Sequence, residues 1–134
     1  MNSERIRINP PALAKPAGFT HAVRSTGTTT VYLAGQTALD QSGAIVGDGV
    51  VSQFEQALRN LLTALSAAGG APEDLVTLTV YIVDMDDYKA NAREIGLVWK
   101  RLVGSDYPAM AGIGVQRLWD AEALIEVQGI AVLP

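Results

Sequence analysis

The stretches Tyr107-Pro-Ala-Met-Ala-Gly-Ile-Gly-Val115 and Ala123-Leu-Ile-Glu-Val-Gln-Gly-Ile-Ala-Val-Leu133 decide the fold of this chain. Both are rich in β-branched and small apolar residues, and a polar connection separates them, so we expect two sheet strands. Side chains alternate between the faces of a strand, which in the second stretch places Glu126 and Gln128 side by side in an otherwise apolar row. Burying a carboxylate and an amide without partners is costly, so these two side chains lie at a solvated edge, pair across the sheet, or line a pocket.

Further strands are predicted upstream by short segments with alternating side chains. They cover residues 6–9, 21–25 and 29–34, and the connection Thr26-Gly-Thr28 has the length and glycine content of a hairpin loop. The clearest strand covers residues 74–83, where apolar side chains alternate with threonine, tyrosine and valine. We expect this strand to lie at the centre of the sheet.

Two helices are predicted by apolar residues that recur at three- and four-residue steps. The first covers residues 50–68 and ends at Gly69-Gly70, since glycine commonly follows the last helical residue. Ser52 and Glu55 have the spacing of a capping box near its start. The second runs from Met85 or Asp87 to Leu102. Its predicted inner face carries Tyr88, Ala92, Ile95, Trp99 and Leu102.

The order of these elements predicts one α/β (α+β) domain over residues 1–134, with two helices packed on one face of a mixed sheet of five to six strands. The opposite face of the sheet would then be uncovered and too apolar to meet only water. We therefore expect the chain to associate with itself. The uncovered face is predicted to carry Thr77, Thr79, Tyr81, Met110, Gly112, Gly114, Leu124 and Ile130.

The composition excludes several classes of function. Apolar residues make up 49% of the chain and charged residues 18%, which is typical of an ordered domain. The net charge is −4 and the basic residues are scattered, so we expect no nucleic-acid binding. With no cysteine and a single histidine, neither a disulfide nor a thiolate or multi-histidine metal site is expected. No secretory signal and no membrane span are expected either, and we predict a cytoplasmic protein.

Motifs that could carry chemistry have simpler structural explanations. A Ser-His-Asp site would need His21 as its base, but the chain has no G-x-S-x-G turn. Gly112-Ile-Gly114 lacks the third glycine and the helix of a phosphate loop, so close backbone approach explains it better. Asp84-Met-Asp-Asp87 precedes a helix, where acidic residues act as caps and complement the dipole. Arg93 and Arg117 are expected to be solvated charges.

Segments along nearly the whole chain together resemble one known family. These are Gly18-Phe-Thr-His-Ala-Val23, Val31-Tyr-Leu-Ala-Gly-Gln36, the strand from Asp74 to Asp84, Tyr107-Pro-Ala, and Ile125-Glu-Val-Gln-Gly-Ile-Ala-Val132. They are similar to the reactive-intermediate deaminase family (RidA, or YjgF/YER057c/UK114, also called L-PSP endoribonuclease). The resemblance implies a chorismate-mutase-like fold, homotrimers with ligand pockets between subunits, and no cofactor. It also implies a metabolite as the partner.

The resemblance also shows where this sequence diverges from active deaminases, which hydrolyse 2-aminoacrylate and related enamines or imines to a keto acid and ammonia. Their carboxylate-binding arginine falls at Met110, and the glutamate that positions water falls at Gln128. Glutamine cannot accept a proton at neutral pH, so acid-base catalysis is absent from that position. Phe19 and the turn containing Gly35 and Gln36 are retained, and these five residues form the predicted ligand-binding set.

Three hypotheses follow for the function. The first is a binding protein for a small, less anionic metabolite with weak or absent deaminase activity. The second is an active enamine or imine deaminase, a hydrolase, in which Glu126 or Arg93 has replaced the missing groups. The third is a ribonuclease or translation inhibitor, against which the acidic charge and the lack of a histidine pair speak.

Overall fold

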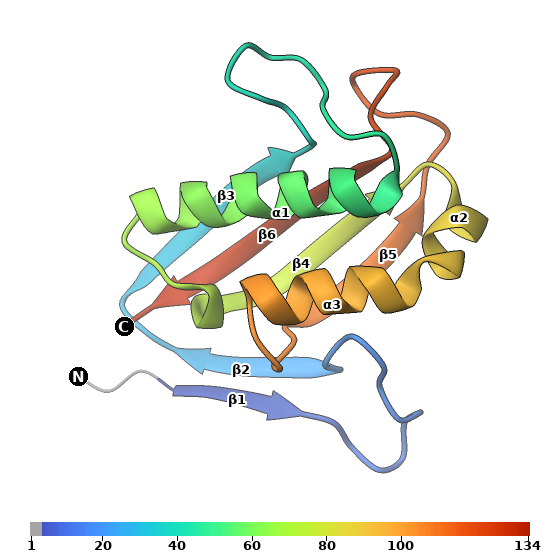
Figure 1. Ribbon diagram of the computed structural model, residues 1–134. Helices are drawn as coiled ribbons and strands as arrows, with labels where there is room; N and C mark the ends of the chain where they lie inside the picture. Colours follow the sequence, from blue (N-terminus) through green and yellow to red (C-terminus); the bar gives the residue numbers. More distant parts are fainter. Residues whose placement is uncertain (1–3) are drawn as a thin grey trace.

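The computed structural model describes residues 4–134 and confirms the mixed α and β class (Figure 1). A mixed sheet of four strands has the order β3-β6-β4-β5, and two more strands form a separate sheet. The strands are β1 (Glu4–Ile8), β2 (Ala22–Thr26), β3 (Thr29–Gln36), β4 (Leu75–Ile82), β5 (Ala109–Gly114) and β6 (Ile125–Leu133). The helices are α1 (Val50–Ala67), α2 (Met85–Ala90) and α3 (Ala92–Leu102), with a 3-10 turn at Pro72–Asp74.

The predicted hairpin between residues 21–25 and 29–34 is wrong. β2 pairs antiparallel with β1, whereas β3 pairs antiparallel with β6. The connection between them is bound to the end of β6 instead: the Thr28 amide donates to the Leu133 carbonyl, 3.0 Å away, and a Cβ atom at Gly27 would overlap that same carbonyl. Gly27 therefore lets the chain pass from one sheet to the other against β6, so the six strands form two sheets.

The hydrophobic core lies between the four-stranded sheet and the two longer helices, which cross the same face of the sheet (Figure 1). β4 lies between β6 and β5, which confirms its central position. The apolar row of β6 faces the helices, as expected: Ile125, Val127, Gly129, Ala131 and Leu133 are all buried. Within residues 4–134, no helix is long and apolar enough to cross a membrane.

Two details of the helices differ from expectation. α1 starts at Val50 with Gly49 as its N-cap, so Ser52 and Glu55 lie inside the helix and form no capping box. The second predicted helix is divided at Asn91, whose side chain donates to the Asp87 carbonyl oxygen at 2.9 Å and so competes with helical pairing. The acidic run before α2 is a cap, as predicted: Asp84 accepts a hydrogen bond from the Asp87 amide at 3.0 Å.

The uncovered face of the sheet differs from the predicted one in β5. Met110 pairs in register with Leu78, which is buried under the helices, and Gly112 and Gly114 follow it on that same side. The small residues of β5 give no periodic signal, and for this reason the prediction of which β5 side chains lie on the uncovered face is wrong. Leu124 precedes β6 and packs against the core. The open face instead carries Tyr32, Thr77, Thr79, Tyr81, Ala111, Ile113, Glu126, Gln128 and Ile130.

A buried amide ties α1 to the segment before β6. Gln53 is 3% exposed; its amide nitrogen donates to the Glu122 carbonyl at 3.1 Å, and its oxygen accepts from the Leu124 amide at 2.8 Å. Both backbone groups would lose their partner without this side chain. Gln53 therefore fixes where β6 enters the sheet.

We expect Gln53→Met, which keeps the side-chain volume, to lower the free energy of unfolding by about 2 kcal/mol, because it leaves two backbone groups unpaired. Urea denaturation followed by circular dichroism measures this. The matched control is Gln56→Met on the same helix, which removes one half-buried bond to Asn60 and should cost less than about 1 kcal/mol. Equal losses in the two variants would contradict the anchoring role of Gln53.

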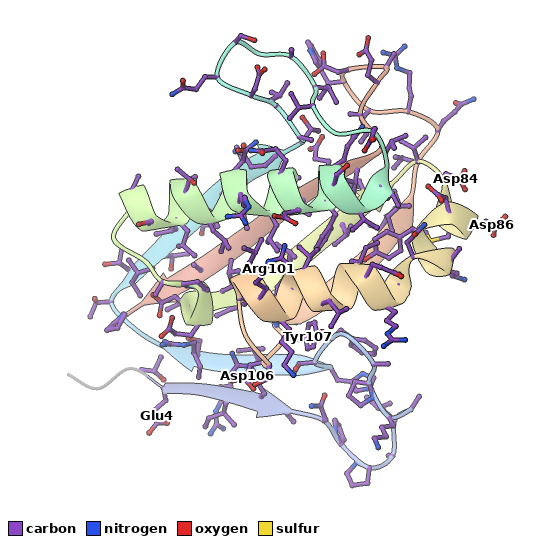
Figure 2. The ribbon with its side chains drawn as sticks, in the orientation of Figure 1. Glu4, Asp84, Asp86, Arg101, Asp106 and Tyr107 are labelled. Atoms are coloured by element: carbon purple, nitrogen blue, oxygen red, sulfur yellow. The ribbon has the colours of Figure 1, made fainter. Side chains whose placement is uncertain are left out.

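Glu55 links α1 to α3 through ion pairs with Arg59 and Arg101, and Arg101 lies on the side of α3 that faces α1 (Figure 2). The hydrogen bonds from Arg59 and then Arg101 hold the pKa of Glu55 below its ordinary value of 4.5. A pKa lowered by folding contributes stability above pH 4.5 that is lost as the pH falls through the folded-state pKa.

We therefore expect Glu55→Gln to destabilise the protein by less than about 1 kcal/mol at neutral pH, because the pairs are only partly buried. The difference from the unmodified protein should shrink as the pH falls below 4.5 and through the folded-state pKa, which urea denaturation at several pH values measures. The control is Glu73→Gln, at an exposed carboxylate without an ion pair among the described residues, which should change the free energy of unfolding little at neutral pH. A deficit that persists unchanged at acid pH would contradict the ion-pair explanation.

Candidate functional site

The five residues of the predicted ligand-binding set lie in two groups on opposite faces of the four-stranded sheet. Met110 faces the helices. Gln128 faces away from them, in register with Thr79, and Gly35 and Gln36 lie at the irregular end of β3. Phe19 follows the loop residue Gly18, beside the start of β5. Within one chain the five therefore do not line one pocket.

Met110 borders a cleft of about 440 Å³ between the helices and the start of β5, whereas Phe19 lies next to the rim residue Gly18 and does not line the cleft. Buried side chains form its floor and exposed residues form its rim. The floor consists of Phe54, Ile95 and Trp99; the walls are Tyr88, Gly96, Tyr107 and Met110; the rim is Ala17, Gly18, Ala92 and Arg93. An apolar cleft of this size with a few polar groups is typical of a small-molecule site.

Aromatic stacking shapes one wall of the cleft. The rings of Trp99 and Tyr107 are parallel within 12° and their centroids lie 5.2 Å apart. The Trp99 ring nitrogen donates to the Asp106 carbonyl oxygen at 3.0 Å, which fixes the connection between α3 and β5. Figure 2 shows Asp106 and Tyr107 in that connection, on the side of the two-stranded sheet. Tyr107 in the wall is thus stacked on Trp99 in the floor, and both line the cleft together with Met110.

Two polar side chains accompany the aromatic wall. Burial raises the pKa of Tyr88 above its ordinary value of 10.0, and the neighbouring Tyr107 adds to this effect. The Tyr88 hydroxyl is therefore protonated at neutral pH and can donate a hydrogen bond. Arg93 is exposed at the rim and, among residues 4–134, forms neither an ion pair nor a hydrogen bond. It is a solvated charge, as expected, but one at the border of the cleft.

Phe19 and His21 occupy the loop that leads to the cleft. Their rings meet edge to face with centroids 4.9 Å apart, and a His21 ring nitrogen lies 2.7 Å from the Ala14 carbonyl oxygen. Thr20 bridges to Ala109 at the start of β5. His21 therefore ties a loop together, in agreement with its rejection as a catalytic base.

The second group lies on the open face of the sheet. The Tyr81 hydroxyl donates to the Gln128 amide oxygen at 3.1 Å across two paired strands. The Glu126 carboxylate rests against the backbone of Gly35, where any Cβ atom would overlap it. The Gln36 amide points back to the Ala34 carbonyl at 3.5 Å. Gln128 is thus paired across the sheet and also lines a hollow on the open face, two of the three situations expected for these residues. Glu126 lies on an interior strand, between β3 and β4, and not at an edge of the sheet.

Sequence reasoning did not assign Tyr88, Trp99 or Tyr107 to a site. Tyr88 and Trp99 belong to the helical stripe that was assigned to the core, and a cleft between a helix and a sheet has no periodic signal of its own. Tyr81 was expected on the open face, but its bond to Gln128 depends on strand register. Within residues 4–134, no group of three or more acidic or histidine side chains is placed to hold a metal ion.

A family model described as Endoribonuclease L-PSP matches residues 10–133 of the chain. The chain belongs to the RidA family. This RidA-family chain is 36% identical over 104 residues to the 2-iminobutanoate/2-iminopropanoate deaminase of Capra hircus, covering 77% of this chain and 72% of that relative. It is 32% identical over 119 residues to a RutC family protein of Pyrococcus horikoshii, covering 87% and 89%.

A solved structure of a Rid-family protein is similar in fold to this chain. The Rid-family protein YyfB of Yersinia pestis, described as a protein of unknown function, has a TM-score of 0.86 and 36% identity, with 96% of this chain and 98% of that chain covered. The expected fold class is therefore confirmed.

We expect a spectrophotometric titration of the phenolate absorbance to contain a late step above pH 10 from Tyr88, because burial keeps this phenol protonated. Tyr88→Phe should remove that step. The control is Tyr32→Phe, at a tyrosine that is 78% exposed, which should leave the late step unchanged. Loss of the late step in the control alone would show that Tyr88 does not lie in a buried wall.

Proposed function

We propose that this RidA-family protein binds a small metabolite in a pocket shared between copies of the chain, with weak or absent 2-imino acid deaminase activity. The observation that carries the proposal is the chemistry of two positions. Met110 presents a thioether to the cleft, and Gln128 presents an amide whose oxygen already accepts a bond from Tyr81. Neither group can hold a carboxylate by charge or accept a proton.

The division of the predicted set over two faces supports a shared pocket. A ligand that touches both Met110 and Gln128 must contact two chains, because the sheet separates the two residues within one chain. The open face is also apolar enough to favour association: Tyr32 is 78% exposed and Ile113 is 43% exposed. A closed homotrimer, as the family resemblance implies, would bring the cleft side of one chain to the open face of the next.

The effect of Met110 in place of an arginine on the affinity for a carboxylate can be estimated. A charge-assisted hydrogen bond contributes about 1.5 to 3 kcal/mol, and about 1.4 kcal/mol corresponds to a factor of ten in affinity. A carboxylate at Met110 should therefore bind at least about tenfold more weakly than it would to an arginine. The part of the pocket next to Met110 suits an uncharged group, which a flexible thioether accommodates well.

An active deaminase remains the second candidate because two charged groups lie near the predicted positions. Arg93 borders the cleft that contains Met110, and Glu126 neighbours Gln128 on β6 beside Gly35. Curated relatives that carry the name of a deaminase support this candidate at the level of the family. The two candidates differ in a single measurable quantity, the rate of imine hydrolysis.

That rate is measured as ammonia release from 2-iminopropanoate generated in solution by an amino-acid oxidase. We expect little acceleration by the unmodified protein, since both the ionic contact and the proton acceptor are missing. Met110→Arg together with Gln128→Glu should increase the rate by about a hundredfold or more, the usual contribution of a general base. Activity of the unmodified protein equal to that of the double variant would establish the second candidate instead.

Mixing the single variants tests the shared pocket directly. Met110→Arg and Gln128→Glu chains are unfolded together and refolded, so that they assort at random. If each pocket takes Met110 from one chain and Gln128 from the next, roughly a quarter of the pockets in a closed ring will hold both new residues. The mixture should then be active although each single variant is not. An inactive mixture beside an active double variant would mean that the pocket does not join these two positions from different chains.

A further inference from the structure

Arg93 is the one cationic side chain that borders the cleft among the described residues 4–134. It stands near the start of α3, exposed at the rim, without an ion pair or a hydrogen bond in that part of the chain. A rim charge of this kind attracts anions and can orient a ligand that enters the cleft.

The cleft offers an extended apolar surface below this charge. Its floor is buried aromatic and aliphatic, and the half-buried Tyr107 ring, stacked on the buried Trp99 ring, lines the cleft together with Met110. A volume of about 440 Å³ exceeds the needs of a three- or four-carbon acid and lies in the lower range of pockets for small organic ligands. The dimensions and the lining therefore suit a flat or branched apolar body.

We propose that the cleft binds amphiphilic carboxylic acids, with an apolar or aromatic body against Trp99 and Met110 and the carboxylate at the rim on Arg93. This inference rests on the proposed function and names the ligand class of that same site. It also gives a reason for weak deamination. In a 2-imino acid the carboxylate is bonded to the imine carbon, so a carboxylate held at the rim keeps that carbon at the rim as well, in contact with solvent.

The Tyr88 hydroxyl gives the cleft a second polar contact. Because it is protonated at neutral pH, it can donate to a carbonyl or hydroxyl group on the body of the ligand without repelling the acid. Arg93 then supplies the charge contact and the Tyr88 hydroxyl a neutral one. The expected ligand therefore has its acid group at one end only.

Binding is measured through the emission of Trp99 in a Trp119→Phe background, where Trp99 is the remaining one of the two tryptophans. Trp119 is 91% exposed and does not border the cleft, so this substitution leaves the site intact. The probes are 3-phenylpropanoate, the isosteric neutral 3-phenylpropanamide, and propanoate, which has the acid group without the ring. Low ionic strength is used because salt screens an exposed charge.

We expect 3-phenylpropanoate to bind about five- to tenfold more tightly than the amide, the lower end for a charge-assisted bond because Arg93 is exposed. Propanoate should bind more weakly than 3-phenylpropanoate, since it leaves the aromatic floor uncovered. Arg93→Gln should abolish the preference for the acid over the amide, and Arg93→Lys should restore part of it. Arg24→Gln is the matched control: Arg24 is exposed on β2, outside the cleft, and its loss changes the net charge equally.

Equal binding of the acid and the amide, or a preference that survives Arg93→Gln, would overturn this inference. An emission of Trp99 that responds to none of the three probes would overturn it as well. The proposed function is judged separately by ammonia release, which depends on Met110 and Gln128 and uses none of these probes. A failure of the ligand class is thus distinguishable from a failure of the proposed function.

Discussion

The pairing of β4 with β6 is the constraint on which the rest of the molecule depends. It sets the side chains of both strands in register, so that Val80 and Val127 face the helices together while Tyr81 and Glu126 face away. One face is then sealed by α1 and α3, and the other is left open with polar and aromatic side chains (Figure 1). The placement of the candidate site follows from that division, because β5 presents Met110 on the side of the helices and β6 presents Gln128 on the open side.

Much of the fold could be predicted because its periodic signals are strong. The apolar stripe of α1 and the alternating apolar side chains of β4 and β6 predict these elements, their order and the burial of one face of the sheet. β5 was different, since alanine and glycine leave no contrast between its faces and its phase was assigned incorrectly. The hairpin prediction was wrong for another reason: a short glycine-containing connection has the same local signal whether the flanking strands pair with each other or with distant partners. Here β2 pairs with β1 and β3 pairs with β6, and the short connection between β2 and β3 carries no information about these partners.

The candidate site was predictable only in part. The resemblance to the family identified Met110 and Gln128, and the structure places both on surfaces accessible to a ligand. The sequence could not show that Met110 and Gln128 lie on opposite faces of the sheet, since this depends on which side chains of β5 face the helices. Tyr88 and Trp99 were assigned to the core because a helical stripe does not distinguish a side chain that fills the interior from one that walls a cleft. Arg93 has the sequence signal of any solvated charge, and only the fold places it at the rim of the cleft.

We propose that the pocket needs more than one chain, because the four-stranded sheet separates Met110 from Gln128 within each copy. The mass of the unmodified protein in solution at micromolar concentration, determined by light scattering or sedimentation, tests this most directly. A closed ring of three chains of 14.2 kDa each predicts about 43 kDa. A mass of 14.2 kDa, that of a single chain, would contradict the account, since no ligand could then contact Met110 and Gln128 together.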